Sequence, residues 1–223
     1  VPGASYSESA STLGESETIG CCHSRRIVKV HLMPQRSDEW LQIRVGKITA
    51  SQVGKMLATT KSGWSAQRHD LRMQLACEHL TGYSCETPFV ASAAMQHGID
   101  QEDASVLVYE SLHGAVVDRS VGFLESDDGM CGCSPDGLVV DGDDRGLLEC
   151  KNPTTKNHVA YLRSHVVPAQ YVAQLTHSLY VAGPDYKFID FFSYDDRLPP
   201  GLRAFFVREW RDEAKIAAHA EAV

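Results

Sequence analysis

The sequence contains no apolar stretch of the roughly 20 residues that a helix needs to cross a bilayer. We therefore expect no membrane-spanning helix. Cysteines are few, seven in 223 residues, and their number is odd. An odd count without a secretory signal argues against a framework of disulfides and favours reduced thiols in a cytoplasm.

Positive charge is also scarce, because 21 Lys and Arg stand against 29 Asp and Glu, a formal net charge of −8. This balance argues against a protein that coats nucleic acid through bulk electrostatics, since such proteins are basic. It is compatible with an enzyme whose carboxylates bind divalent cations. The bound ions then supply positive charge where a phosphate must sit.

The composition divides the chain into two parts. Residues 1–24 are rich in Ser, Glu, Gly and Thr and show no apolar periodicity, which predicts a flexible tail. Residues 25–223 have the length and apolar content of a single domain with a buried core. We expect one domain over this range.

Apolar spacing of the helical period indicates a series of helices. A short helix carries Val53 and Met56 and begins at Thr49 or Ser51, and Ser37 is a plausible cap for the helix before it. The other predicted helices cover residues 38–46, 67–80, 93–112, 155–165, 168–181 and 209–222.

Short apolar segments separated by Asp-Gly and Gly-Asp pairs indicate strands joined in a meandering sheet. The predicted strands cover residues 26–33, 116–124, 130–133, 138–140, 146–150, 186–193 and 204–207. Helices and strands therefore alternate in groups along the chain. This order predicts an α/β or α+β fold with a central mixed β-sheet flanked by helices.

The informative pair of strands carries charged residues at its end. If Asp136 opens one strand of a hairpin and Glu149 and Lys151 lie on the next, the period of two places Glu149 and Lys151 on one face and Cys150 on the other. Asp136 can reach the same place across the pair. Two carboxylates with a backbone carbonyl form a hard-oxygen site that suits Mg²⁺, and a lysine beside them can hold or deprotonate a water.

An Asp followed by Glu-x-Lys is a weak signal by itself, because acidic residues and lysines are common and a solvated hairpin gives the same pattern. The residues around it are more informative. An apolar run that ends in Glu149 and Lys151 places two charges at the end of a strand that is otherwise buried. Buried charges are costly unless they are paired or bound to metal.

Residues 134–137, Ser-Pro-Asp-Gly, followed by Glu149-Cys150-Lys151 resemble the PD-(D/E)XK nuclease motif as it occurs in the lambda exonuclease, or YqaJ-like viral recombinase, family. Further segments resemble that family in the same order along the chain, from about residue 35 to 210. They are residues 39–51, 98–102 and 171–175. The resemblance implies the PD-(D/E)XK nuclease fold.

The resemblance also implies roles for individual residues. Metal ligands would be Glu102, Asp136, Glu149 and the carbonyl of Cys150, and Lys151 would orient or activate the attacking water. The metal would be Mg²⁺ or Mn²⁺, with two ions per active site. A second set of side chains would hold the 5′-phosphate of a DNA end, namely Arg44, Ser51, Ser134 and Gln174.

The implied activity is 5′-to-3′ digestion of one strand of linear double-stranded DNA, which leaves single-stranded DNA for recombination by strand annealing. The implied partners are DNA ends, two further copies of the chain in a toroidal homotrimer, and a single-strand annealing protein, in a bacterial or phage-encoded cytoplasmic system. Two alternatives remain: a PD-(D/E)XK endonuclease that cuts internally, and an inactive scaffold that binds DNA ends.

Overall fold

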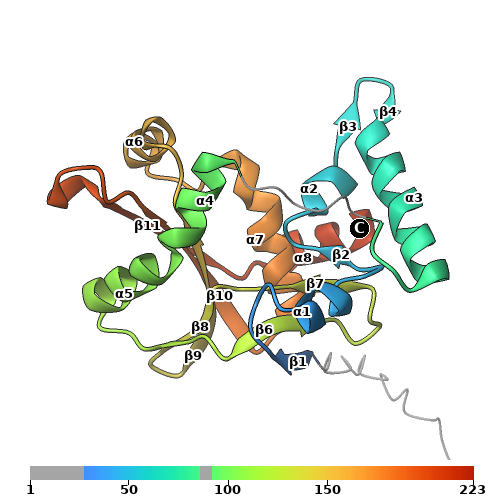
Figure 1. The fold of residues 1–223 in the computed structure, drawn as a ribbon, viewed down its shortest axis with the longest axis horizontal. Helices are drawn as coiled ribbons and strands as arrows, with labels where there is room; N and C mark the ends of the chain where they lie inside the picture. The colour runs from blue at the N-terminus through green and yellow to red at the C-terminus, as the bar shows by residue number, and fades with distance from the viewer. Residues whose placement is uncertain (1–27, 86–91) are drawn as a thin grey trace, which may run out of the picture.

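The computed structural model describes residues 28–85 and 92–223 (Figure 1). The flexible tail predicted over residues 1–24 lies outside the described residues. No helix in the described part of the chain is both long and apolar enough to cross a membrane. The helices are α1 Asp38–Ile43, α2 Val53–Met56, α3 Ala66–Thr81, α4 Ala93–Asp100, α5 Glu102–His113, α6 Thr155–Ser164, α7 Ala169–Ala182 and α8 Glu213–Ala222, with a 3₁₀ turn at Pro200–Leu202.

Capping residues explain where several of the helices begin and end. The Ser37 hydroxyl accepts a hydrogen bond from the backbone N–H of Trp40 and opens α1. Gly82 adopts φ 74° and ends α3, as the sequence predicts. The predicted start of α2 at Thr49 or Ser51 is wrong, because Thr49 ends a strand and Gln52 precedes the helix.

Two predicted helices have different bounds in the structure. The helix expected over residues 93–112 is divided, because Gln101 (φ −92°, ψ −5°) separates α4 from α5 and places Glu102 in the first turn of α5. The last helix begins at Glu213, since the residues up to Trp210 belong to a strand. Sheet pairing there outweighs the helical spacing of the apolar residues.

The strands form two larger sheets and a hairpin. The four-stranded sheet has the order β1-β6-β7-β2, the five-stranded sheet has the order β11-β10-β9-β8-β5, and β3 pairs with β4. The strands are β1 Lys29–Leu32, β2 Ile48–Thr49, β3 Thr59–Thr60, β4 Gly63–Trp64, β5 Val117–Asp118, β6 Val121–Glu125, β7 Cys131–Cys133, β8 Gly137–Asp141, β9 Asp144–Lys151, β10 Tyr186–Tyr194 and β11 Ala204–Trp210.

The expected central mixed sheet is the five-stranded one, in which β9 and β10 run parallel and the other pairs antiparallel. The expectation of one continuous meander is wrong. The segment predicted as a single strand over residues 116–124 divides into β5, which pairs with β8, and β6, which pairs with β7 in the other sheet. Hydrophobic spacing alone does not indicate which sheet a strand joins.

Helices cover both faces of the five-stranded sheet. Leu147 and Ile189 belong to the apolar cluster that α7 completes, whereas Leu148 and Phe192 belong to the cluster that α5 completes. The alternation follows from the period of two along each strand. α7 also packs against β6 and β7, so it lies between the two sheets (Figure 1).

A buried ion pair joins β10 to β11. Asp190 is fully buried and accepts hydrogen bonds from the Tyr109 hydroxyl at 2.5 Å and from Arg208 Nε at 2.8 Å. Arg208 also binds Asp141, whose side chain is 62% exposed. The two carboxylates contact the same guanidinium and differ mainly in burial.

Asp190→Ala is expected to lower the free energy of unfolding by about 3–5 kcal/mol, because it leaves Arg208 without its buried partner. Asp141→Ala is the matched control, and its exposed pair is worth about 0–1 kcal/mol. Urea denaturation of both variants measures the difference. Equal losses of unfolding free energy in the two variants would contradict the assignment of Asp190 and Arg208 as a buried ion pair.

A pair of buried histidines joins α7 to α8 and to the four-stranded sheet. His177 Nδ1 lies 2.9 Å from His219 Nε2, and His177 Nε2 lies 3.1 Å from the carbonyl oxygen of Ile48. A carbonyl only accepts, so His177 Nε2 carries the proton and Nδ1 accepts one from His219. Burial, together with the neighbouring His219, lowers the pKa of His177 to about 3.

Acid is therefore expected to destabilise the fold through His177. Its pKa is lower in the folded state, so the unfolded chain binds a proton first and stability falls as the pH drops below about 6.5, by up to about 1.4 kcal/mol per pH unit. Chemical denaturation between pH 7.5 and 5 measures the slope. His177→Asn should give a smaller slope than the wild type, whereas identical slopes would contradict a neutral buried His177.

Candidate active site

The structure contains the hairpin of β8 and β9 that the sequence predicts, with β8 beginning one residue after Asp136. Gly137 pairs with Leu148, and the N–H of Asp136 donates to the carbonyl of Leu148 at 2.9 Å. Asp136 Oδ2 accepts a hydrogen bond of 2.6 Å from the N–H of Cys150. Asp136 therefore lies beside Glu149, at the end of the hairpin where the ladder between the two strands stops.

Glu149 is held by two donors. Its side chain is 5% exposed, and its Oε1 accepts hydrogen bonds from Lys151 Nζ and, at 2.6 Å, from Gln174 Nε2 of α7. Glu149 and Lys151 thus share the face of β9 that α7 covers. The predicted Gln174 reaches this centre as well, but its partner here is the carboxylate of Glu149.

The charges of this cluster strongly influence one another. Burial raises the pKa of Asp136 far above its usual range, and the neighbouring Glu149 and Glu102 carboxylates raise it further, against the opposing effect of Lys151. Burial alone would lower the pKa of Lys151, but Glu149 and Asp136 outweigh it and the pKa is raised. The lysine is therefore a cation among carboxylates that repel each other.

Glu102 lies across a cleft from the hairpin, in the first turn of α5. The cleft has a volume of about 340 Å³, and its walls include Arg36, Glu102, Arg119 and Asp136. Arg36 Nη2 lies 2.5 Å from Glu102 Oε2, and Arg119 Nη2 lies 3.6 Å from Glu102 Oε1. Two arginines thus hold the carboxylate that the family resemblance implies as a metal ligand.

The donor set suits a divalent cation in part. Asp136 and Glu149 place hard oxygen atoms side by side, and their mutual repulsion favours a bound cation. Among residues 28–85 and 92–223, however, no three His, Cys, Asp or Glu side chains are gathered as a ready metal-binding group. Glu102 would complete a set of three, and its two oxygens already contact Arg36 and Arg119.

The remaining predicted phosphate-binding residues lie near the four-stranded sheet. The Arg44 guanidinium lies 4.1 Å from the centre of the Trp40 ring, and Trp40 Nε1 donates to Ser134 Oγ at 2.8 Å. Trp40 therefore connects Arg44 to Ser134. The sequence indicates only a packing residue at position 40, because an apolar helical position does not show what an indole N–H will bind.

Ser51 lies at the same end of this sheet as Ser134. β2 and β7 run parallel with Thr49 opposite Gly132, so Ser51 and Ser134, each two residues further on, both follow the paired strands. Ser51 Oγ is 3.3 Å from Thr49 Oγ1. Ser51 and Ser134 therefore follow the same ends of β2 and β7, and Trp40 connects Ser134 to Arg44.

Pro135 alone separates Ser134 from Asp136. It is buried, and its carbonyl accepts a hydrogen bond of 2.8 Å from Gln35 Nε2. Its ring fixes φ near −65°. The link between the phosphate-side residues and the carboxylates is therefore short and stiff.

Comparison with known families agrees with this geometry. The model of the YqaJ-like viral recombinase domain matches residues 39–185, which include the hairpin, α5 and the segment of Gln174. The chain belongs to the YqaJ-like viral recombinase family. Its fold is the PD-(D/E)XK nuclease fold, and the family places the chain among nucleases.

Solved structures similar to this chain include proteins that are named as exonucleases. The complex of LHK-Exo with dAMP has 33% identity and a TM-score of 0.72, covering 83% of this chain and 88% of that one. The alkaline exonuclease LHK-Exo from Laribacter hongkongensis gives 33% identity, a TM-score of 0.70 and the same coverage. A phage related exonuclease from Haemophilus somnus 129PT is 15% identical, with a TM-score of 0.55 and coverage of 79% and 91%, and supports the fold alone. No curated protein sequence matches the chain.

Sequence reasoning missed the two arginines of the cleft. Arg36 precedes the cap of α1, and Arg119 lies in the turn between β5 and β6. The sequence did contain a sign of a turn at Arg119. Residues 118–120, Asp-Arg-Ser, are three polar residues that interrupt an apolar segment predicted as one strand. The pairing with Glu102 depends on contacts between distant parts of the chain.

Mn²⁺ or Mg²⁺ is expected to raise the thermal midpoint of unfolding, because an ion that binds only the folded state at 100 times its Kd adds about 2.7 kcal/mol. Asp136→Asn should lose most of this shift while its amide oxygen still accepts from Cys150. Differential scanning fluorimetry with and without the metal measures both. An equal shift in the variant would argue against Asp136 as a ligand.

Proposed function

We propose that this nuclease is a 5′-to-3′ exonuclease that digests one strand of linear double-stranded DNA from a 5′-phosphorylated end. The observation that carries the proposal is that the Asp136–Glu149–Lys151 cluster and the Arg44–Trp40–Ser134 group stand on either side of Pro135. One group suits hydrolysis of a phosphodiester and the other suits a terminal phosphate. Their proximity favours cutting near an end.

Arg44, Ser51 and Ser134 are proposed to bind the terminal phosphate. A guanidinium forms strong, directional hydrogen bonds with phosphate oxygens, and two hydroxyls can add further donors. Such contacts distinguish an end that carries a 5′-phosphate from one that lacks it. They leave the base sequence unread, because they reach only the phosphate.

Asp136, Glu149 and Lys151 are proposed to carry the hydrolysis. Divalent cations, Mg²⁺ or Mn²⁺ and two per site, would supply charge neutralisation and activation of water when held by Asp136, Glu149, Glu102 and the Cys150 carbonyl. Lys151, kept as a cation by its neighbours, orients the attacking water and stabilises the charge that develops on the phosphate. Gln174 holds Glu149 in place and faces the bound phosphate.

Each round of hydrolysis removes one nucleotide from the strand. Water adds to the phosphorus of the second nucleotide, the bond from phosphorus to the 3′-oxygen of the first nucleotide breaks, and that oxygen takes up a proton. A 5′-mononucleotide leaves, and the remaining strand again carries a 5′-phosphate for the same pocket. dAMP, which one solved relative binds, belongs to this class of product.

The proposal extends to assembly and cellular context. Residues 25–223 would form a single exonuclease domain, and three copies would close a ring around duplex DNA. A closed ring would retain DNA despite the net charge of −8. The single-stranded product would pass to an annealing protein in a bacterial or phage-encoded cytoplasmic recombination system.

Digestion of linear duplex DNA with Mg²⁺ tests the activity, with Lys151→Ala as the inactive comparison. We expect loss of linear DNA, faster with a 5′-phosphate than without it, and a decrease of about 100-fold or more in Lys151→Ala, the usual size of a lost transition-state contact. Closed circular DNA should survive. Cutting of circles would instead indicate an endonuclease, and no digestion with any divalent metal would indicate a scaffold.

Arg44→Gln separates end recognition from hydrolysis. It should abolish the preference for 5′-phosphorylated ends and leave digestion of ends without the phosphate nearly unchanged, because such an end offers no phosphate to the guanidinium. Initial rates on the two substrates give the ratio. A ratio equal to that of the wild type would remove Arg44 from the pocket.

A further inference from the structure

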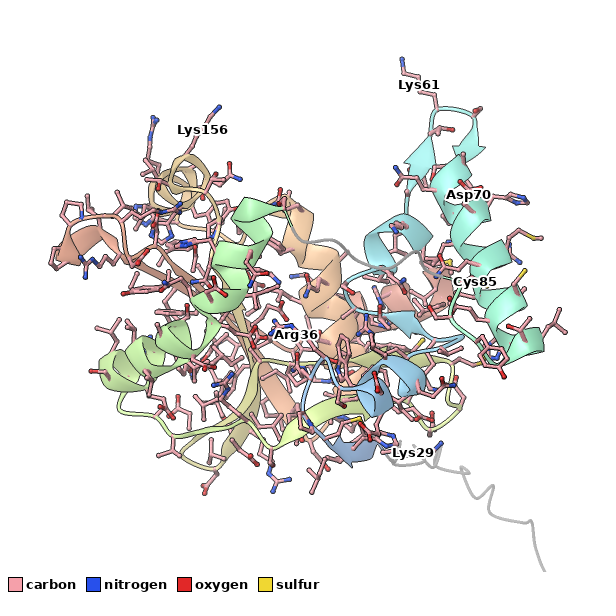
Figure 2. The ribbon with its side chains drawn as sticks, viewed as in Figure 1. Lys29, Arg36, Lys61, Asp70, Cys85 and Lys156 are labelled. Atoms are coloured by element: carbon pink, nitrogen blue, oxygen red, sulfur yellow. The ribbon has the colours of Figure 1, made fainter. Side chains whose placement is uncertain are left out.

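The two arginines that hold Glu102 differ from ordinary surface arginines. Figure 2 labels Arg36 near the middle of the view. Arg36 also has a positive φ of 69°, a conformation that is strained for residues other than glycine. The preceding residue, Gln35, is tied to Pro135 beside Asp136.

Arg119 approaches the Glu102 carboxylate from the turn between β5 and β6, which is distant from Arg36 in the sequence. Its Nη1 lies 2.7 Å from Asp103 Oδ1, while its Nη2 faces Glu102. Partial burial lowers the pKa of Arg119, but the carboxylates of Asp103, Glu102 and Asp136 outweigh this effect and raise it. The guanidinium therefore lies within the field of the whole acidic cluster.

Each guanidinium also faces the cleft. The side chains of Arg36 and Arg119 are 51% and 40% exposed, while that of Glu102 is 18% exposed. A guanidinium carries five N–H donors, so a contact with one carboxylate leaves an edge for another anion. Arg36 and Arg119 can therefore bind an oxyanion in the cleft next to Asp136.

Glu102 cannot serve its arginines and a metal ion fully at once. Two guanidinium groups neutralise the carboxylate in the arrangement described here, and a divalent cation on the same oxygens would repel both. If Glu102 turns to the cation, the arginines lose their partner inside a partly buried cleft. A phosphate oxygen would restore the balance of charge.

We propose that Arg36 and Arg119 form an exchangeable clamp. They bind Glu102 in this structure and bind a nucleotide phosphate in the cleft beside Asp136 once Glu102 binds a divalent cation. The clamp rests on the proposed function. It gives these arginines a part in binding substrate and product. It also makes binding of metal and of nucleotide phosphate mutually favourable, since such coupling is reciprocal.

Metal binding without nucleotide tests the first half of the exchange. Free Mn²⁺ is measured by electron paramagnetic resonance during titration of the full chain and of Arg36→Gln/Arg119→Gln. Removal of the competing guanidinium groups should tighten Mn²⁺ binding by about fivefold or more. The double variant Arg72→Gln/Arg163→Gln changes two exposed arginines, one on α3 and one on α6. It is the control of equal charge and should leave the affinity within about twofold of the wild type.

A double-mutant cycle with Glu102 shows whether the arginines act through that carboxylate. In the Glu102→Gln background, the two arginine substitutions should no longer tighten Mn²⁺ binding, because the ion pairs are already gone. An unchanged Mn²⁺ affinity in the arginine variant would overturn the clamp. An increase of the same size in both backgrounds would overturn it as well, since it would reflect net charge alone.

Nucleotide binding at saturating Mn²⁺ tests the second half. Affinity for dAMP, measured by calorimetry, should fall about tenfold or more in Arg36→Gln/Arg119→Gln, the loss expected for a charge-assisted hydrogen bond. Affinity for deoxyadenosine, which lacks the phosphate, should not change. Unchanged dAMP affinity would overturn the clamp.

Digestion of linear DNA by the wild type, run in parallel, separates the two proposals. If the wild type digests DNA, but the arginine variant binds Mn²⁺ and dAMP as tightly as the wild type does, the clamp alone is wrong. If the wild type neither binds Mn²⁺ nor digests DNA, the proposed function fails and the clamp fails with it.

Discussion

The repulsion between two carboxyl groups, Asp136 and Glu149, is the interaction on which the rest of the site depends. The register of β8 and β9 places these groups side by side where the ladder ends, and burial reduces the screening of their charges by water. The groups around them reduce the cost: the N–H of Cys150 for one, Lys151 and Gln174 for the other. Without a partner for each charge, the hairpin would not be stable in this form.

The same constraint explains why the neighbouring helices are placed as they are. The face of β9 that carries Glu149 is covered by α7, which supplies an amide donor, and the opposite face is covered by α5, which supplies apolar packing from Val106. α5 begins with Glu102, so its polar first turn meets the acidic cluster while its later turns enter the core. α5 thus contributes a charged residue to the acidic cluster and apolar residues to the core, because its first turn lies at the edge of the sheet.

Local pattern predicted the parts of the fold that local chemistry determines. Period-two spacing and turn residues indicate the hairpin of Asp136 and Glu149, and caps such as Ser37 and Gly82 indicate helix ends. The sequence did not predict the separation of β5 from β6 into two sheets, because both have the same apolar spacing. Nor did it predict that Arg36 and Arg119 would meet Glu102, since that ion-pair cluster depends on packing between segments far apart in the chain. The resemblance to a family supplied the site residues, and the physical pattern alone supplied only the hairpin.

The buried Pro135 between Ser134 and Asp136 has a further consequence under the proposed function. If the end of a strand is held at Ser134 and cut beside Asp136, the distance between these two residues determines how much of the strand is removed in each step. Proline fixes the backbone at that position, and Gln35 holds its carbonyl at 2.8 Å. A fixed distance would make the length of each excised piece constant. The number of nucleotides removed per cut would then depend on this peptide segment and not on the DNA sequence.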